Sequence, residues 1–243
     1  MVVNKLYDYE NFQENHLICL NWVPKGSRVL EFGPATGFMT RHLRDELNCS
    51  VTGFEYSPEA AAQAASFCEQ MIVGDAEDFT LWKSLHSPYD VIIFADVLEH
   101  LREPQSVLAY CREFMSPDGR LLISIPNIAH WTIRLSLLKG AFDYTSCGIL
   151  DNTHLKFFTK KTLFEMIHAA GFDVEEIKSR HTNYPLDVPF RRIHLMRVKR
   201  VFNWVFDKVF PNAAAFQMVV NCRPNPTFVV SHVAPLYETI SDR

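Results

Sequence analysis

The chain has 243 residues, of which 48% are hydrophobic and 21% charged, and its formal net charge is −4. This length suits one α/β domain with an appendage and is ample for a buried core. The charge argues against a strongly basic nucleic-acid-binding protein, and no apolar run reaches the roughly 18 residues of a membrane span. Six scattered cysteines without a Cys-x-x-Cys pair indicate reduced thiols. With a polar N-terminus unlike a signal peptide, these features predict a cytoplasmic protein.

Short apolar runs alternate with helix-length segments from residue 28 onward. The expected strands are 28–32, 50–55, 70–74, 90–95 and 119–125, and the expected helices are 37–48, 57–69 and 103–115. The strands are almost continuously apolar, which is typical of parallel strands covered on both faces. One helix has clear start signals, with Ser57 as the cap and Pro58 in the first turn. The pattern predicts an α/β fold with a Rossmann-like, doubly wound, mostly parallel sheet.

The C-terminal part adds three further expected elements. A helix should run from a Thr159 cap to Gly171, followed by a strand over 172–179, and a last strand is expected over 213–224. These two strands bring the expected sheet to seven. Between them, Phe190–Phe210 is predicted to form an aromatic and basic α-helical insertion. We therefore expect one domain over 1–243, with a core at about 25–180, the insertion and last strand at 181–225, and a tail at 226–243.

A glycine-rich turn follows the first expected strand, in VLEFGPATGF. Gly33 and Gly37 would let the chain pass close beneath a ligand, and Glu31 lies two residues before the first glycine. A dinucleotide fold requires G-x-G-x-x-G, whereas here Ala35 stands at the second glycine. No tyrosine has a lysine four residues on, as a short-chain dehydrogenase would need. Glu31 would repel a pyrophosphate but suits a cationic amino-acid group, so NAD is disfavoured.

These residues resemble the E/D-x-G-x-x-x-G motif of class I S-adenosylmethionine-dependent methyltransferases. Further family landmarks follow in order. Glu55 ends the second strand, Gly74-Asp75-Ala76 follows the third, DVIIFADVLEH resembles the family's fourth strand, and DGRLL resembles the start of the fifth. The resemblance covers about residues 25–180 and implies S-adenosylmethionine as cofactor. It implies that Glu55 holds the ribose hydroxyls and that Asp75 reads the adenine amino group. The implied cofactor residues are Glu31, Gly33, Gly37, Glu55, Tyr56, Asp75 and Ala76.

Tyr56 and Asp75 also have structural interpretations. Tyr56 could lie against the adenine ring or could equally be core or surface filler at a strand end. Asp75 could simply cap the turn that follows it, because aspartate is common in such turns.

A second polar cluster, Asp96-Val97-Leu98-Glu99-His100, follows the fourth expected strand. If a helical turn begins at Asp96, spacings of three and four place Asp96, Glu99 and His100 on one face. With His154 in a later loop, the cluster is similar to the ligand pattern of metal-assisted O-methyltransferases, including ubiquinone-pathway and small-RNA 2′-O-methyltransferases. The resemblance implies a divalent metal on Asp96, Glu99, His100 and His154 that lowers the pKa of a substrate hydroxyl.

The same cluster also occurs in sugar methyltransferases without an implied metal. In that alternative the pair shapes the pocket floor, and His100 or His154 is the general base. His130 and His168 are expected to be structural, and Asn127 is as suited to capping the next helix as to touching substrate.

The later block, from SIPNIAHW to HAAGF, is similar to bacterial methyltransferases associated with surface-glycan assembly. The leading hypothesis is O-methylation of a sugar or other small hydroxylated acceptor. The alternatives are a non-catalytic module that binds a partner through its C-terminal aromatic segment, and a nucleic-acid 2′-O-methyltransferase, which charge −4 disfavours.

The basic Phe190–Phe210 segment has two interpretations of its own. In the first, it is a helix that covers either the substrate side of the sheet or a partner chain in a homo-oligomer. In the second, its basic face binds an anionic acceptor, either in solution or at a membrane surface.

Overall fold

The computed structural model describes residues 13–181, 204–206, 208–210 and 212–228. Its strands are β1 Arg28–Phe32, β2 Ser50–Glu55, β3 Gln70–Val73, β4 Tyr89–Ala95, β5 Met115–Pro126, β6 Phe172–His181 and β7 Ala215–Pro224. Its helices are α1 Glu14–Leu20, α2 Phe38–Asp45, α3 Pro58–Ala64, α4 Pro104–Cys111, α5 Trp131–Leu138 and α6 Lys160–Ala169. Short 3₁₀ turns are η1 Ala65–Phe67, η2 Leu81–Ser84, η3 Leu98–His100 and η4 Arg112–Phe114.

The strands form one seven-stranded sheet in the order β3-β2-β1-β4-β5-β7-β6. The first five strands in the chain run parallel to one another, and β7 runs antiparallel to both β5 and β6. The expected Rossmann-like, mostly parallel sheet is therefore confirmed. The order reverses direction between β1 and β4, which places a ligand-binding crevice at the carboxyl ends of these strands.

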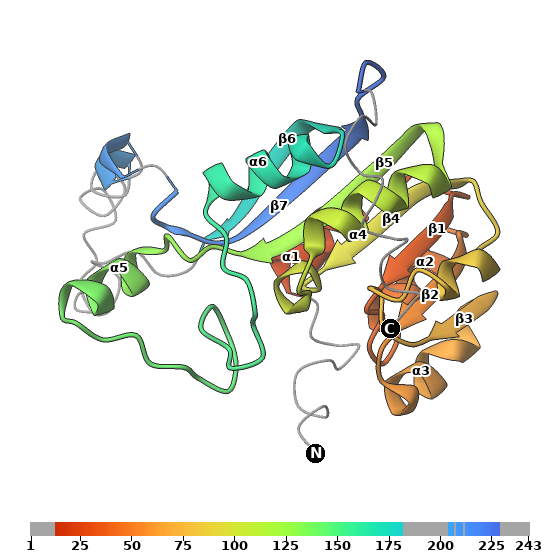
Figure 1. Cartoon of the computed structure of the whole chain (residues 1–243), viewed down its shortest axis with the longest axis horizontal. Helices are drawn as coiled ribbons and strands as arrows, with labels where there is room; N and C mark the ends of the chain where they lie inside the picture. The colour runs from red at the N-terminus through yellow and green to blue at the C-terminus, as the bar shows by residue number, and fades with distance from the viewer. Residues whose placement is uncertain (1–12, 182–203, 207, 211, 229–243) are drawn as a thin grey trace, which may run out of the picture.

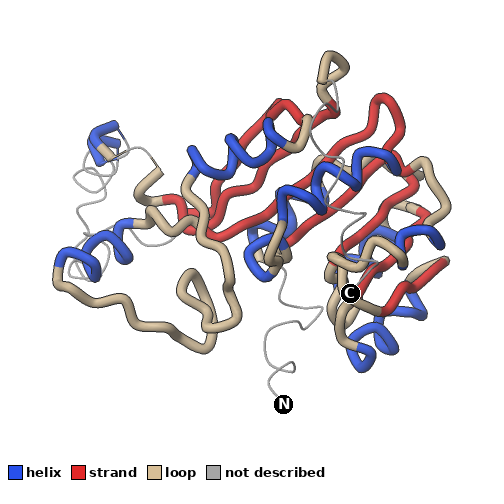
Figure 2. Tube along the Cα trace, viewed as in Figure 1, coloured by secondary structure: helices blue, strands red, loops and turns tan. Residues whose placement is uncertain are grey.

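Two apolar layers cover the sheet. On one face α4, α6 and η2 pack on it through Leu108, Ile167 and the fully buried Trp82. On the other face α1 and α2 pack through Leu20 and Leu43. Figure 1 shows α4 and α6 side by side along the sheet, and Figure 2 shows α5 and the long loop after it extending from the end of the molecule opposite β3.

Several predicted boundaries are confirmed, and one helix was not expected. The β1 and β2 strands have the predicted bounds, and Ser57 and Thr159 accept hydrogen bonds as the caps of α3 and α6. The short helix α1 lies in a stretch without an apolar helical pattern. It is held by tertiary contacts, because Asn15 and His16 are buried together with Cys19 and Leu20.

The Phe190–Phe210 segment lies largely outside the described residues, as does the tail from residue 229. Of that segment, 204–206 and 208–209 are helical and precede β7, and Trp204, Val209 and Phe210 are exposed. Among the residues that are described, no helix is long and apolar enough to cross a membrane.

Candidate functional site

The turn after β1 has the tight geometry that its glycines predict. Gly33 and Gly37 have φ angles of 66° and 86°, in the left-handed region. A Cβ on Gly33 would lie 2.6 Å from Cγ2 of Val97, and one on Gly37 would lie 2.9 Å from Cα of Ala64. The turn is thus pressed between the loop after β4 and helix α3. Ala35 also has a positive φ, of 50°.

Two buried carboxylates flank this turn. Glu55, at the end of β2, accepts hydrogen bonds from the backbone N–H of Ala35 and of Ser57, both at 2.9 Å. Glu31 is only 2% exposed and accepts a 2.7 Å hydrogen bond from the Thr40 hydroxyl. Burial raises the pKa of Glu31 to about 7, against the opposing effect of the Thr40 hydrogen bond. Among the described residues Glu31 has no cationic partner. Its carboxylate therefore suits a positively charged group of a ligand.

Asp75 caps a turn and also lies in the wall of a pocket. Its Oδ1 accepts from the backbone N–H of Glu77, so it caps the turn after β3. Its Oδ2 accepts from Arg102 at 3.1 Å, and the residue also lies in the wall of a pocket. Tyr56 is 75% exposed, so it is not core filler, and it borders the same pocket.

A cavity of about 670 Å³ lies at the carboxyl ends of the central strands. Its wall includes, of the predicted residues, Glu31, Gly33, Glu55, Tyr56, Asp75, Ala76, Asp96 and His100. The structure therefore brings most of the predicted set into one hollow. Gly37 is outside the wall and serves as the N-terminal cap of α2.

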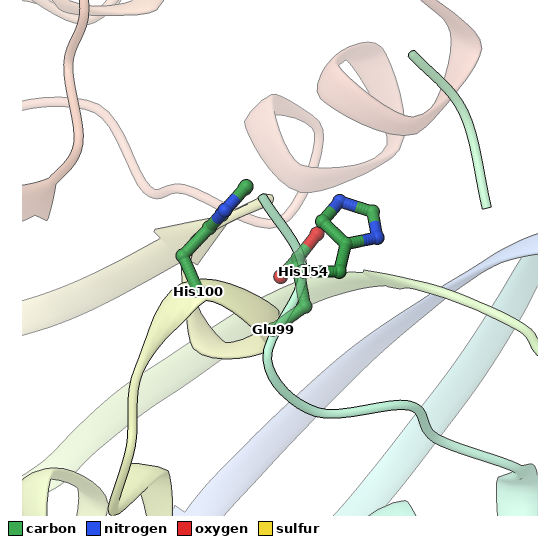
Figure 3. Close-up of side chains that lie close together, drawn as sticks. All are labelled: Glu99, His100 and His154. Atoms are coloured by element: carbon green, nitrogen blue, oxygen red, sulfur yellow. The ribbon is translucent and has the colours of Figure 1, made fainter. Parts of the chain in front are cut away.

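Beside this cavity, Glu99, His100 and His154 form a cluster whose potential ligand atoms lie within 4.8 Å of one another. Figure 3 shows Glu99 and His100 on the turn after β4 and His154 on the loop that crosses it. That loop is fixed there because the carbonyl oxygen of Glu99 accepts from the N–H groups of Leu155 and Lys156. The two imidazole centroids are 4.8 Å apart.

Both histidines use the same ring nitrogen, Nδ1, for a contact with a backbone carbonyl oxygen. Nδ1 of His100 lies 3.2 Å from the carbonyl oxygen of Thr153, and Nδ1 of His154 lies 3.1 Å from that of Ile149. A carbonyl oxygen can only accept, so each Nδ1 carries the proton and each Nε2 keeps a lone pair. Partial burial lowers the pKa of His100, and the neighbouring His154 lowers it further, which favours the neutral ring.

Glu99 is the buried member of the cluster. It is 2% exposed, and neither carboxylate oxygen has a hydrogen-bond partner among the described residues. Burial raises its pKa well above the ordinary value, and the charge of Asp96 adds to this effect. An orphaned buried carboxylate beside two imidazole lone pairs is a donor set that fits a divalent cation.

Asp96 does not share the geometry of this cluster. Its φ of 58° is left-handed, so no helical turn begins there, and the 3₁₀ turn starts only at Leu98. Its carboxylate instead accepts from Asn15 Nδ2 at 3.2 Å and from Gln217 Nε2, and it lies 3.5 Å from Nε2 of His16. The expectation of three polar side chains on one helical face is therefore wrong. Asp96 joins α1 to the sheet.

The remaining predicted polar residues have structural surroundings. His130 is 2% exposed, caps α5 and packs edge-on against Phe216. Asn127 is fully buried and hydrogen-bonds the backbone of Asn212, Ala215 and Ala129, and because the cap of α5 is His130, the expectation that Asn127 caps this helix is wrong. His168 is exposed at the end of α6 and pairs with Asp173 rather than packing among apolar neighbours.

Sequence reasoning missed the three other titratable residues of the pocket wall, namely His16, Glu77 and Arg102. His16 comes from the helix that was not expected, and its ring packs edge-on against Phe38 at 4.8 Å. Glu77 directly follows one recognisable motif and Arg102 lies two residues after another, but nothing in the local sequence indicates that they meet.

Comparison with known proteins agrees with this arrangement. Residues 7–177 match the family described as a methyltransferase domain. The chain is 28% identical over 165 residues to a ubiquinone biosynthesis O-methyltransferase of Cereibacter sphaeroides, covering 61% of each protein, so it spans about three-fifths of that relative's length. Among solved structures, the CcbJ methyltransferase of Streptomyces caelestis has a TM-score of 0.61 at 14% identity, over 92% of this chain and 95% of that one.

A methyltransferase structure from Archaeoglobus fulgidus, described as SAM-dependent, has a TM-score of 0.58 at 21% identity, over 86% of this chain and 94% of that one. These structural likenesses concern the fold, whereas the family match covers most of the sequence that carries the glycine turn and the acidic strand ends. The chain belongs to the class I S-adenosylmethionine-dependent methyltransferase family.

Proposed function

We propose that this methyltransferase transfers the methyl group of S-adenosylmethionine to a hydroxyl of a sugar or other small-molecule acceptor. The observation that carries the proposal is the pair of Nε2 lone pairs on His100 and His154 beside the cofactor cavity, because hydroxyl methylation requires removal of a proton. The ubiquinone biosynthesis O-methyltransferases among the relatives support oxygen as the methylated atom. The proposal takes from these relatives only the kind of atom that is methylated and not the acceptor molecule.

We assign the cofactor contacts from charge and position. Glu31 lacks a cation and would pair with the ammonium of the methionine part. Glu55, whose two oxygens are already held in place by backbone N–H groups, retains lone pairs for the ribose hydroxyls. Asp75 and Ala76 would border the adenine ring, and the exposed Tyr56 would cover it. The glycine turn leaves room for close approach of the ligand to the backbone.

In-line methyl transfer needs alignment of the acceptor oxygen with the methyl group and removal of its proton. His100 borders the cavity, and its lowered pKa keeps the ring neutral and able to accept a proton at neutral pH. His154 lies beside it with the same free nitrogen. We propose these histidines as the residues that act on the acceptor hydroxyl.

A divalent cation also fits the cluster, with Glu99, His100 and His154 as its ligands. The support is the orphaned carboxylate of Glu99, which has no hydrogen-bond partner among the described residues to balance its burial. A bound cation would supply positive charge that lowers the pKa of the acceptor hydroxyl. Asp96, whose carboxylate is held by α1 and β7, is left out of this proposed ligand set.

The experiment is a screen of hydroxylated acceptors with S-adenosylmethionine labelled in the methyl group, followed by mass spectrometry of the product. Methylation of oxygen in a hydroxylated acceptor is expected, and methylation confined to nitrogen or carbon would contradict the proposal.

The active reaction is then repeated after chelation, with His154→Ala and with His168→Ala as an exposed control. Loss on chelation with recovery on adding a divalent ion supports the cation, whereas turnover that survives chelation but is lost in His100→Ala supports a general base.

The interpretation of Phe190–Phe210 as a surface for an anionic acceptor or a membrane stays a proposal. Liposome flotation with anionic lipid and kinetics of Arg191→Ala/Arg192→Ala with a phosphate-bearing acceptor would test its two versions. A protein that ignores the liposomes and a variant with an unchanged Michaelis constant would contradict both.

A further inference from the structure

The loops after β3 and β4 meet across the mouth of the cavity. In the sheet these strands are separated by β2 and β1, so their ends lie about 14 Å apart at the usual strand spacing. The side chain of Arg102 closes this distance, with Nη2 3.1 Å from Oδ2 of Asp75 and Nε 3.3 Å from Oε2 of Glu77. The connection passes over the strand ends that carry Gly33 and Glu55.

One half of this connection is anchored and the other is exposed. The carboxylate of Glu77 accepts from the backbone N–H groups of Arg102 and Glu103 at 3.2 and 2.6 Å, at the start of helix α4. The side chain of Glu77 is 16% exposed, whereas that of Arg102 is 73% exposed. The guanidinium therefore pairs with a fixed carboxylate but is itself exposed to solvent. It can change rotamer without disturbing the packed structure.

The connected residues belong to the cavity itself. Asp75, Glu77 and Arg102 all line it, beside Ala76 and Leu101. Arg102 therefore lies at the end of the cavity where Asp75 would meet the adenine amino group. Because each oxygen of a carboxylate has two lone pairs, Asp75 can keep Arg102 and still accept from a ligand.

We propose that Arg102 is a clasp over the adenine end of the cofactor site, which holds Asp75 in position and slows release of the cofactor and its demethylated product. The inference rests on the proposed cofactor contacts of Asp75. An exposed ion pair between flexible groups is weak and sensitive to salt, so the clasp opens often enough for exchange. From the typical strength of such pairs, its removal should speed release by about fivefold.

The test is the release rate of S-adenosylhomocysteine from the full chain, measured by stopped-flow displacement at low and high salt. Wild type should release it faster at high salt, and Arg102→Ala should release it faster at low salt and lose the salt dependence. Arg102→Lys should restore part of that dependence. Arg223→Ala is the control, because Arg223 pairs with Glu175 on the β6–β7 side of the sheet and does not line the cavity.

Each outcome decides between the proposals. An Arg102→Ala protein that binds the ligand but releases it at the wild-type rate, or more slowly, would overturn the clasp and leave the cofactor assignment standing. A wild-type protein that binds neither S-adenosylmethionine nor S-adenosylhomocysteine would overturn both. An equal acceleration in Arg223→Ala would show a general effect of lost surface charge and would also overturn the clasp.

Discussion

The backbone N–H of Ala35 donates a 2.9 Å hydrogen bond to Oε2 of Glu55, so the glycine turn after β1 is joined to the end of β2. The other oxygen, Oε1, accepts from Ser57 N–H in front of α3. One carboxylate thus positions two segments of the cofactor cavity. Removing the Glu55 carboxylate should weaken ligand binding in two ways, by loss of the ribose contacts and by loosening of the glycine turn.

Glu55→Ala is therefore expected to weaken binding of S-adenosylhomocysteine by about 1–3 kcal/mol, the cost of leaving buried polar groups unpaired. Isothermal titration calorimetry measures this difference. Glu59→Ala removes an exposed carboxylate four residues further on and should bind like wild type. An unchanged affinity in Glu55→Ala would contradict its assignment to the ribose.

Gly26 and Gly37, two of the glycines with positive φ, allow backbone strain to be distinguished from steric collision when alanine is introduced. Both angles, 75° and 86°, disfavour alanine by about 1 kcal/mol. A Cβ at Gly26 would meet nothing within 4 Å, whereas one at Gly37 would press on the α3 backbone at Ala64. Gly37→Ala should therefore lower the free energy of unfolding by about 1–3 kcal/mol more than Gly26→Ala. Urea unfolding of the two variants measures the difference, and equal losses would show that α3 yields to the added methyl group.

Glu31 should make cofactor binding depend on pH. Its carboxyl has a pKa of about 7 because it is buried, and the ammonium of the cofactor would favour its ionised form. Below pH 7, binding must therefore release a proton, and affinity should rise roughly tenfold per pH unit up to about pH 7 and then level off. Calorimetry in buffers of different ionisation enthalpy counts the released proton. A Glu31→Gln protein should lose this pH dependence, and a wild-type affinity that is flat from pH 5.5 to 8 would contradict the assignment.

In the ligand-free protein, a rise in pH should lower the stability through Glu31, whereas it raises the affinity for the cofactor. Its folded pKa lies above the ordinary value of 4.5, so its favourable contribution to folding is complete below pH 4.5 and is lost as the pH rises through about 7. The shift corresponds to about 3 kcal/mol. Chemical unfolding of wild type and Glu31→Gln across this range should show a larger loss in wild type, because the variant lacks the contribution of this carboxyl.

The parts of the fold that the sequence predicts best are those whose signals are local. The β1 and β2 strands are short, continuously apolar and followed by a glycine turn or a capped helix, so their bounds were predicted correctly. Helix α1 carries no such signal, because its buried Asn15 and His16 find their partner in Asp96, some 80 residues further on. Its position therefore depends on contacts with the sheet and not on its own sequence pattern.

The candidate site divides in the same way. Glu99 and His100 are adjacent in sequence, and family resemblance adds His154, so the cluster was predicted. The exclusion of Asp96 was not, because its left-handed backbone depends on contacts from α1 and β7 that no local pattern contains. The ion pair of Arg102 depends likewise on the spatial order of β3 and β4.

Glu99 should determine whether the cluster binds a divalent cation. Glu99→Gln keeps the shape of the side chain but removes the charge that a cation would balance. Wild type should gain thermal stability when Mg²⁺, Mn²⁺ or Zn²⁺ is added, and Glu99→Gln should gain much less. Differential scanning calorimetry measures both. An equal gain in the two proteins would place the cation elsewhere, and no gain in wild type would favour His100 as a general base.

Asp96 should behave as a structural link and not as a metal ligand. Its carboxylate accepts from Asn15 and Gln217, so Asp96→Asn would turn an amide N–H₂ towards donors and leave at least one buried group unpaired. The free energy of unfolding should fall by about 1–3 kcal/mol, whereas Asp118→Asn, at an exposed position, should have little effect. The cation-dependent gain in thermal stability should remain in Asp96→Asn, because the Glu99, His100 and His154 cluster does not include this residue. Loss of that gain in a protein that is still folded would return Asp96 to the ligand set.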